Sequence, residues 1–377
     1  MKIVCDNKIP FLKGVLEPYA DVVYLPGKET TPEVVRDADA IITRTRTACN
    51  EALLSGSQVQ VIATATIGFD HIDTAWCDAH GIYWENAPGC NSGSVRQYIA
   101  SVLVTLARRY GLNLENTTLG VVGVGNVGRK VAAIARALGM KVLLNDPPRA
   151  RREGPDAFVS LDEICAQSDI ITVHVPLSKE GEDATWHLFD AARLATLRPD
   201  QILINSSRGP VVDNAALKAV LQKSGLKAAV LDVWEGEPQL DPEFVGLLAL
   251  STPHIAGYSA DGKANGTSAA VQVVARSLGL PLVNWIATGV PAPPQALDFE
   301  LDATGKSTQE ALAEAILHTY DVSQDSERLR ADLTQFEKLR GDYPVRREFE
   351  AFTLRLIGGT PALADRLTEI GFKVEIQ

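Results

Sequence analysis

TLGVVGVGNVGRKVAAIARALGMKVLLND, residues 118–146, decides the fold of this 377-residue chain. A short apolar run leads into three glycines, Gly123, Gly125 and Gly128, and an amphipathic helical pattern follows directly. This order of strand, glycine turn and helix predicts a βαβ unit whose backbone can approach a phosphate group. Unpaired N–H groups at the start of the helix, around Asn126 and Val127, favour negative charge there. A glycine turn that only packs the helix on the strand is the alternative.

Asp146 ends the second strand pattern, eighteen residues after Gly128. A carboxylate at this place can accept hydrogen bonds from the ribose of a dinucleotide, and it repels the 2′-phosphate of NADP. The glycine turn and Asp146 together therefore predict that the chain binds NAD. Arg149, three residues further on, is a counter-signal, because a cation there favours a 2′-phosphate.

Short β-branched runs alternate with helical patterns around this stretch, which predicts an α/β fold of two doubly wound parallel-sheet domains. We expect a flavodoxin-like substrate domain from residues 1–92 and 258–285, and a Rossmann NAD-binding domain from residues 93–257. The first of these includes FLKGVLEPYA among its helical patterns, and GTSAAVQVVARSLGL reads as a helix that returns the chain to it.

A proline-rich stretch, WIATGVPAPPQ, separates the last part of the chain, residues 286–377. Three strand patterns and two helical patterns in it predict a small C-terminal α/β domain. Because so small a module is marginal in core size, we expect it to form the interface of a homodimer. A tail packed only on its own chain is the alternative.

The composition excludes several classes of protein. A formal net charge of -11 without a polybasic run argues against nucleic-acid and anionic-membrane partners. The five cysteines are widely spaced and form no C-x-x-C pair, so neither disulfides nor a metal site is expected, and a reducing cytoplasm fits best. The start of the chain lacks the pattern of a signal peptide, and no apolar run approaches the ~18 residues of a membrane span.

Three polar residues each follow a short apolar run in the second half of the chain: Arg208, Glu237 and His254. Parallel strands place such residues together at the edge where open α/β sheets bind ligands. There a carboxylate can orient an imidazole, the imidazole can move a proton, and the guanidinium can bind a substrate carboxylate. This set suits the oxidation of a 2-hydroxy acid. A solvated glutamate and a structural histidine are the alternatives.

Six ordered motifs resemble those of the D-isomer-specific 2-hydroxyacid dehydrogenases: IGFDHID, GVGNVG with Asp146, HVPL, INSSRGPVVD, LDVWEGEP and TPHIAGYS. The resemblance covers about residues 1–285. It implies that His254 exchanges the proton of the C2 hydroxyl, that Glu237 holds the imidazole, and that Arg208 binds the substrate carboxylate. It also implies cofactor contacts from Val175, Asp232 and Gly257.

The length and the C-terminal module narrow the resemblance to members that act on erythronate 4-phosphate in pyridoxine biosynthesis. That resemblance implies substrate contacts from Thr45, Thr66 and Tyr258. In ITRTRT, strand alternation puts Arg44 and Arg46 on one side and the threonines on the other, so either set can face the phosphate. Arg346 and Arg347 are further candidates for the phosphate.

Two other functions stay open from the sequence: 3-phosphoglycerate dehydrogenase or another D-2-hydroxyacid dehydrogenase, and an NAD-sensing corepressor that binds proteins. The other histidines lack a carboxylate or cysteine at ligand spacing in the sequence, so no metal site is expected. We expect His71, His174 and His187 to be structural or to line the cofactor site, and His80 and His318 to lie on the surface.

Overall fold

The computed structural model describes residues 1–376 of the chain. They form two compact units, each made of two separate segments. Unit 1 comprises residues 1–91 and 259–291, and unit 2 comprises residues 92–258 and 292–377. Both units are built on parallel sheets, as the sequence predicts.

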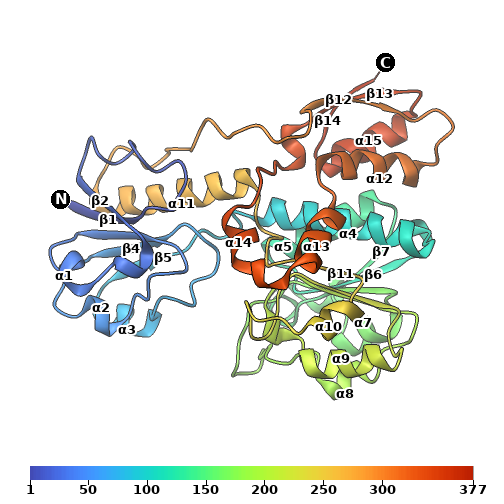
Figure 1. Ribbon diagram of the computed structural model, residues 1–377, viewed down its shortest axis with the longest axis horizontal. Helices are drawn as coiled ribbons and strands as arrows, with labels where there is room; N and C mark the ends of the chain where they lie inside the picture. Colours follow the sequence, from blue (N-terminus) through green and yellow to red (C-terminus); the bar gives the residue numbers. More distant parts are fainter. Residues whose placement is uncertain (377) are drawn as a thin grey trace. The chain divides into compact units, whose positions relative to one another are not determined.

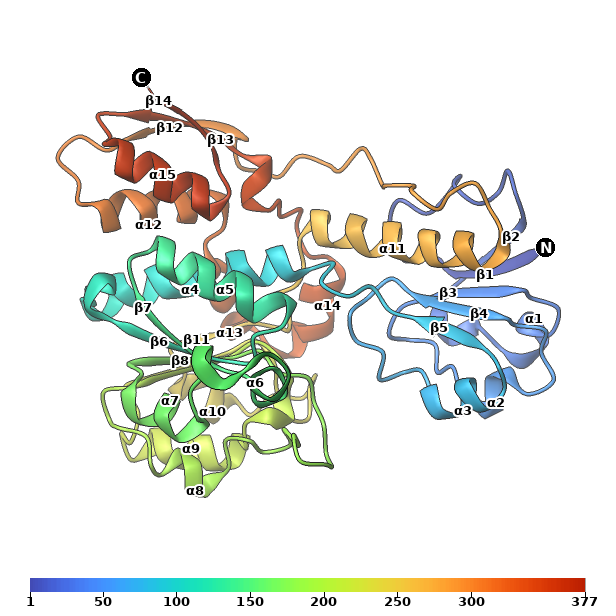
Figure 2. The ribbon, with the colours of Figure 1, turned by 180° about the vertical axis from the view of Figure 1, so that it is seen from behind.

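Unit 1 is a five-stranded parallel sheet with the order β2-β1-β3-β4-β5, the flavodoxin-like arrangement. Helix α11 covers one face and the short helices α1 to α3 cover the other (Figure 2). The strands are β1 (Lys2–Asp6), β2 (Asp21–Leu25), β3 (Ala40–Thr43), β4 (Val61–Thr64) and β5 (Tyr83–Glu85). The helices are α1 (Pro32–Val35), α2 (Glu51–Leu54), α3 (Thr74–Ala79) and α11 (Ala260–Leu278).

Two segments of unit 1 differ from the expected pattern. FLKGVLEPYA, residues 11–20, forms a series of turns instead of a helix. Phe11 and Gly14 both have positive φ, and a proline at position 18 removes a helical hydrogen bond, so a regular helix cannot form. Strand β3 ends at Thr43, and Thr45 and Arg46 lie in a turn. The expected alternation of side chains therefore does not continue through ITRTRT.

The main sheet of unit 2 has six parallel strands in the order β11-β10-β9-β8-β6-β7. Helices α4 and α5 pack on one face and α7 to α10 on the other (Figure 1). The strands are β6 (Thr118–Val122), β7 (Lys141–Asn145), β8 (Ile170–Val173), β9 (Ile202–Asn205), β10 (Ala228–Leu231) and β11 (Leu250–Ser251). The helices are α4 (Ser92–Tyr110), α5 (Asn126–Ala137), α6 (Pro147–Glu153), α7 (Leu161–Gln167), α8 (Ala191–Leu194), α9 (Asn214–Gln222) and α10 (Pro242–Leu247). The strand order reverses between β6 and β8, the place where such folds bind nucleotides.

The C-terminal segment of unit 2 adds a parallel sheet, β12 (Asp298–Asp302), β13 (Thr353–Ile357) and β14 (Lys373–Ile376), in that order. Its helices are α12 (Thr308–Thr319), α13 (Val322–Ala331), α14 (Phe336–Gly341) and α15 (Pro361–Ile370). Short 3-10 turns occupy Gly27–Glu29, Leu114–Asn116, Pro155–Ala157, Gly209–Val211, Leu333–Gln335 and Phe349–Ala351.

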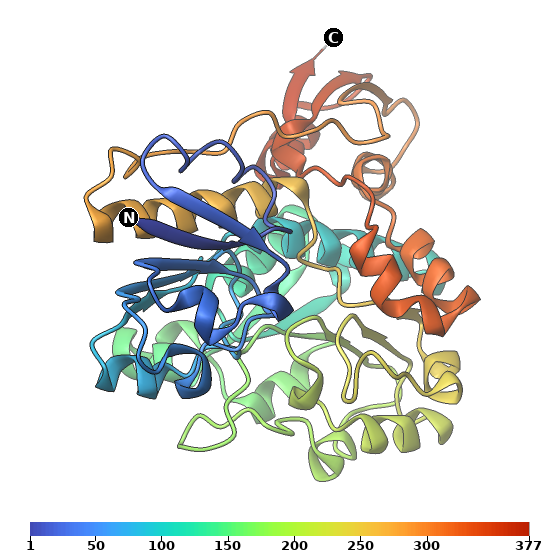
Figure 3. The same ribbon diagram turned by 60° about the vertical axis from the view of Figure 1, so that its left-hand side comes forward.

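Helices α12 and α15 share one apolar core with α4 and α5, through residues such as Ile316, Leu367 and Phe352. Helices α13 and α14 were not foreseen from the sequence. Helix α13 packs along β11, next to the end of the main sheet (Figure 3). There Ser326 Oγ accepts a hydrogen bond from Ser251 N at 3.0 Å, and Arg330 donates to Leu248 O at 2.6 Å. The core of the C-terminal segment is thus continuous with that of residues 92–258.

Within residues 1–376, no helix is long and apolar enough to cross a membrane. All five cysteines are free thiols, and Cys5, Cys49, Cys77 and Cys165 are buried. For Cys5 and Cys49, burial raises the pKa of the thiol, which makes both groups poor nucleophiles.

Candidate active site

The glycine turn lies between β6 and α5, and its three glycines serve different purposes. Gly123 has φ 85°, and a Cβ there would lie 2.7 Å from His174 O. A Cβ on Gly128 would lie only 1.9 Å from Gly123 O, so this glycine lets the helix pack closely on the turn. Gly125 is exposed, and a Cβ there would meet nothing within 4 Å. The open space at Gly125, at the N-terminus of a twelve-residue helix, fits a bound pyrophosphate.

These contacts predict different effects for two alanine substitutions: a loss of stability at Gly128 and a loss of NAD binding at Gly125. Gly128→Ala should lower the free energy of unfolding by about 1–3 kcal/mol, because the turn must shift to make room for the methyl group. Gly125→Ala should leave stability nearly unchanged but weaken NAD binding, since its methyl group enters the space of the pyrophosphate. Thermal unfolding and NAD titration of both variants check this. Normal NAD affinity in a folded Gly125→Ala protein would place the pyrophosphate elsewhere.

Asp146 follows β7 and caps α6. Its carboxylate accepts hydrogen bonds from Val124 N at 2.8 Å and from Arg149 N at 3.0 Å, which ties it to the glycine turn. The side chain of Arg149, the counter-signal in the sequence, forms an ion pair with Glu153 at 2.6 Å and donates to Val124 O. The negative charge of Glu153 thus offsets the positive charge of Arg149, which would otherwise favour a 2′-phosphate.

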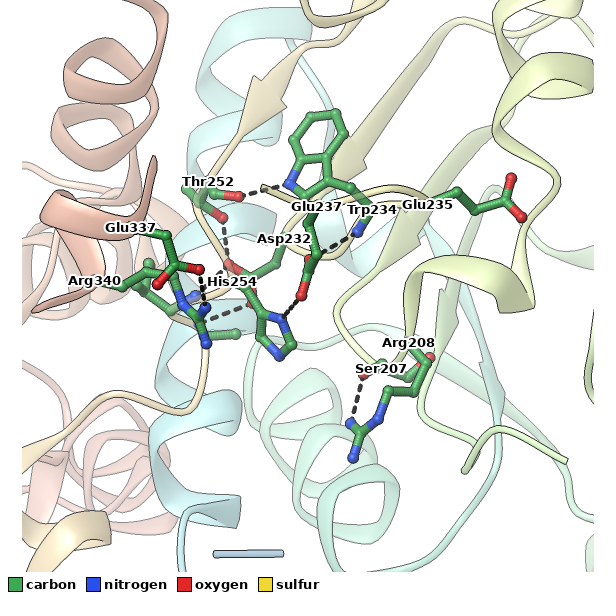
Figure 4. Close-up of polar contacts among 12 residues, drawn as sticks. Ser207, Arg208, Asp232, Trp234, Glu235, Glu237, Thr252, His254, Glu337 and Arg340 are labelled. Atoms are coloured by element: carbon green, nitrogen blue, oxygen red, sulfur yellow. Dashed lines mark hydrogen bonds and ion pairs between the residues drawn. The ribbon is translucent and has the colours of Figure 1, made fainter. Parts of the chain in front are cut away.

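His254 and Glu237 form the central pair of the site. His254 Nδ1 lies 2.6 Å from Glu237 Oε1, and both side chains are about a third exposed (Figure 4). Burial raises the pKa of Glu237, but the hydrogen bond and charge of His254, the charge of Arg340 and the N–H of Trp234 together bring it below its ordinary value. An ionised Glu237 can only accept a hydrogen bond, so Nδ1 of His254 donates it, and in the neutral imidazole Nε2 is then the nitrogen that can accept a proton.

Asp232 fixes the loop that carries His254. It is buried, and its carboxylate accepts hydrogen bonds from Thr252 Oγ1 at 2.6 Å, Ile255 N at 2.8 Å and Ala256 N at 2.9 Å. His254 itself has φ 57°, a backbone conformation that a histidine adopts only when its surroundings impose it. Gly257, half-buried, continues this loop. These bonds give Asp232 a positioning role, in addition to the cofactor contact that the resemblance implies.

Arg208 follows β9, which lies beside β10, the strand that precedes Glu237; β11, which precedes His254, comes next in the sheet. Its carbonyl accepts a hydrogen bond from Asn205 Nδ2 at 2.9 Å, and its guanidinium donates to Ser207 O at 2.9 Å. The next residue, Gly209, packs so tightly that a Cβ would lie 2.1 Å from Trp234 O. The segment of Arg208 is therefore in contact with the segment of Glu237, and the guanidinium and the imidazole extend to the same side (Figure 4).

Residues of the C-terminal segment reach this site, for which the sequence indicated only Arg346 and Arg347, as candidates for the phosphate. Arg346 is buried and donates to Ala256 O at 2.6 Å, so it supports the His254 loop and is not exposed to a phosphate. Arg340 lies over the ring of Tyr258 at 5.7 Å, and Tyr258 packs edge-on against Tyr343. The carbonyl of Arg347 accepts a hydrogen bond from Gln97 Nε2 at 2.8 Å. In the sequence, the signal for these contacts is the cluster of arginines in KLRGDYPVRRE.

The substrate residues expected in unit 1 lie just past β3 and β4. Thr45 and Arg46 are exposed in the turn after β3, whereas Arg44 lies 3.4 Å from the buried carboxylate of Asp6. Thr66 is half-buried, and its hydroxyl lies 2.8 Å from that of Thr64 and donates to Gly68 O. Their contacts with the substrate therefore stay predictions, for Thr45, Thr66, Arg44 and Arg46 alike.

The remaining histidines do not form a metal centre, and residues 1–376 contain no group of acidic, histidine and cysteine side chains that could hold a metal ion. Burial lowers the pKa of His71 and lowers the pKa of His174 to about 3, so both are neutral. His187 does have a carboxylate partner, Glu235, at 2.8 Å, which its distance in the sequence concealed. His80 lies on the surface, but His318 is half-buried and stacks on Phe299.

Val175 completes the expected cofactor residues. It follows β8, and its Cγ1 would lie 2.8 Å from a Cβ on Gly123, so it packs directly on the glycine turn. The turn, Val175 and Asp146 thus lie at the carboxyl ends of β6, β8 and β7, where the strand order reverses.

The chain is similar to known proteins in sequence. Residues 94–256 match the D-isomer specific 2-hydroxyacid dehydrogenase, NAD binding domain, and residues 293–371 match a domain of unknown function. Erythronate-4-phosphate dehydrogenase from Bacteroides fragilis is 49% identical over 355 residues, which cover 94% of this chain and 99% of that protein. The chain belongs to the erythronate-4-phosphate dehydrogenase family. The Porphyromonas gingivalis member is 42% identical over 99% of this chain and 100% of its own length.

Solved structures agree on the fold. A D-lactate dehydrogenase from Aquifex aeolicus, solved in complex with NAD and lactic acid, is 27% identical with a TM-score of 0.62, and it covers 78% of this chain and 100% of its own. The TT0316 protein from Thermus thermophilus is also 27% identical, with a TM-score of 0.64, and covers 74% of this chain and 98% of its own.

Proposed function

We propose that the protein oxidises 4-phospho-D-erythronate to (R)-3-hydroxy-2-oxo-4-phosphooxybutanoate with NAD, a step of pyridoxine biosynthesis. The relatives that match nearly the whole chain carry the name of this activity. The observation that carries the proposal is the 2.6 Å contact between His254 Nδ1 and Glu237 Oε1, because it prepares a base at the carboxyl ends of the same sheet that carries the nucleotide-binding turn.

His254 is the base of the reaction. With Nδ1 donating to Glu237, Nε2 takes the proton from the C2 hydroxyl as the carbonyl forms, and it returns the proton in the reverse direction. Glu237 stabilises the imidazolium that results, and the hydrogen bonds of Asp232 to the 252–256 loop hold the ring in place. Arg208 binds the C1 carboxylate with its planar fork and polarises the C2 oxygen.

The nicotinamide, when bound, supplies the acceptor for the hydride of C2. The residues that would hold the dinucleotide are those of the glycine turn, with Asp146 at the adenosine ribose and Asp232, Val175 and Gly257 toward the nicotinamide. The open space at Gly125 and the two backbone bonds that fix Asp146 support this assignment.

Asp146→Asn should narrow the preference for NAD over NADP by roughly tenfold or more, the factor that ~1.4 kcal/mol supplies. The two backbone N–H groups bind different oxygens of Asp146, so the asparagine keeps an acceptor for one of them, and it no longer repels a 2′-phosphate. The ratio of kcat/KM for the two cofactors measures this, with the exposed Asp156→Asn as the matched control. An unchanged ratio would mean that the ribose is held elsewhere.

A substrate panel with the purified protein and NAD tests the proposed function directly. We expect NADH formation with 4-phosphoerythronate and a much lower kcat/KM with 3-phosphoglycerate. A preference for 3-phosphoglycerate would assign the chain to serine synthesis. No NADH formation with any 2-hydroxy acid would favour an NAD-sensing binding protein.

For substrate binding, we propose that Thr45, Thr66 and Tyr258 contact the substrate, with Arg44 and Arg46 as further candidates. Thr45 and Arg46 are exposed, which supports their access to a ligand.

We also propose a cytoplasmic location, which the protein's place in a biosynthetic sequence of small metabolites supports.

We also propose a homodimer formed through residues 286–377. The core of this segment is continuous with that of α4 and α5, so its small size alone no longer requires a partner. On the exposed side of its three-stranded sheet, Arg355 forms ion pairs with Glu300 and Glu375. Sedimentation of the full chain decides the question, and a monomer at micromolar concentration would reject the dimer.

A further inference from the structure

Arg340 brings a second guanidinium to the catalytic pair. It comes from α14 and is drawn with the Glu237–His254 pair in Figure 4. Its charge also interacts with the carboxylate of Glu237, which the imidazole contacts at 2.6 Å. The C-terminal segment thus places a cation within electrostatic range of the Glu237–His254 pair.

The environment of Arg340 differs from that of the structural arginines nearby. Arg346 and Arg330 donate to backbone carbonyls at 2.6 Å, which ties the His254 loop and the end of the sheet to the C-terminal segment. Nη1 of Arg340 instead contacts Glu337, a half-exposed carboxylate, at 3.3 Å. Its buried Nε has no hydrogen-bond partner within residues 1–376.

Aromatic rings hold the guanidinium of Arg340 in one plane. Its central carbon lies 5.7 Å from the ring of Tyr258 and 5.8 Å from the ring of Phe336. Stacking of this kind orients an arginine and removes water from its faces, while N–H donors at its edge stay able to bind an anion. A pre-oriented guanidinium edge suits the oxygens of a phosphate.

We propose that Arg340 binds the phosphate of the substrate and determines the preference for a phosphorylated 2-hydroxy acid. The inference rests on the proposed function, in which His254 acts at C2 and Arg208 takes the C1 carboxylate. A four-carbon substrate then extends its phosphate away from Arg208, and it needs a second cation near His254. The D-lactate dehydrogenase, whose named ligand has no phosphate, leaves part of this chain unmatched although its own chain is fully covered.

Arg340→Gln should raise KM for 4-phosphoerythronate about 10- to 100-fold, the effect of losing charge-assisted hydrogen bonds, with a smaller change in kcat. The KM for unphosphorylated D-erythronate should change less than threefold, a margin well below one charge-assisted bond. Arg340→Lys should restore part of the affinity, because it keeps the charge but not the planar fork. If D-erythronate turns over too slowly to be measured, inhibition by inorganic phosphate is measured in its place. The inhibition constant of phosphate should then rise in Arg340→Gln together with the KM for 4-phosphoerythronate.

Lys338→Gln is the matched control, since it removes a cation from the exposed side of the same helix, where Lys338 pairs with Asp342 at 3.0 Å. It should leave both substrates unaffected. Equal losses for the two substrates in Arg340→Gln, or an unchanged inhibition constant for phosphate, would show that Arg340 only supports the fold. An inactive wild-type protein would instead reject the proposed function.

Discussion

Replacing His254 by alanine should lower kcat by roughly 10²- to 10⁴-fold, the contribution that a positioned general base makes. The base is lost, while the binding residues on the glycine turn and at Asp146 keep their contacts, so NAD affinity should stay within a few-fold of wild type. Initial rates of NADH formation and an NAD titration measure the two effects separately. Near-normal turnover would reject His254 as the base.

The backbone of His254 calls for a second variant. With φ 57°, alanine is strained at this position, and part of any loss could come from a displaced loop. Asparagine tolerates this conformation better than other non-glycine residues, so His254→Asn separates chemistry from strain. Both variants should lose activity to a similar extent if the imidazole itself matters.

Glu237→Gln isolates the role of the carboxylate. Glutamine keeps the shape of the side chain but cannot stabilise the imidazolium, so kcat should fall by less than it does in His254→Ala. The ionised state of Glu237 depends on its neighbours, because burial alone would raise its pKa. An unchanged kcat in Glu237→Gln would mean that the glutamate only fills space.

The local features of the fold were predictable from sequence because each depends on neighbouring residues. The glycine turn and its flanking strand and helix follow from steric needs within a dozen residues, and the structure has β6, the turn and α5 where the pattern puts them. The convergence of Arg208, Glu237 and His254 on neighbouring strands β9, β10 and β11 follows from the parallel order of the sheet.

Features that depend on distant contacts were missed. Helix α13, VSQDSERLRA, is polar and shows little periodicity, and polar bonds such as that between Ser326 Oγ and Ser251 N dock it on β11. The contact of His187 with Glu235 joins residues 48 positions apart. The approach of Arg340 to Glu237 spans about a hundred residues of sequence, and no local pattern encodes it.

Replacing Arg208 should reduce activity nearly as much as replacing His254. Arg208→Gln should lower kcat/KM by about 30- to 3,000-fold, because removing one partner of a close charge pair costs about 2–5 kcal/mol. The main chain should hold its place, since the Arg208 carbonyl is bound by Asn205 Nδ2 and Gly209 packs against Trp234 O independently of the guanidinium. Unfolding temperature should therefore change little, and steady-state kinetics measure the loss.

Arg208→Lys decides how the guanidinium acts. If only positive charge matters, lysine should restore most of kcat/KM. If the planar fork must hold two carboxylate oxygens while it polarises the C2 oxygen, lysine should recover KM in part and leave kcat low, because an ammonium group cannot bind in that bidentate manner. Arg193→Gln, which removes a surface cation paired with Asp162 in the same unit, is the control and should behave as wild type. We expect the second result, since Arg208 and the His254 imidazole extend to the same side of the strand ends.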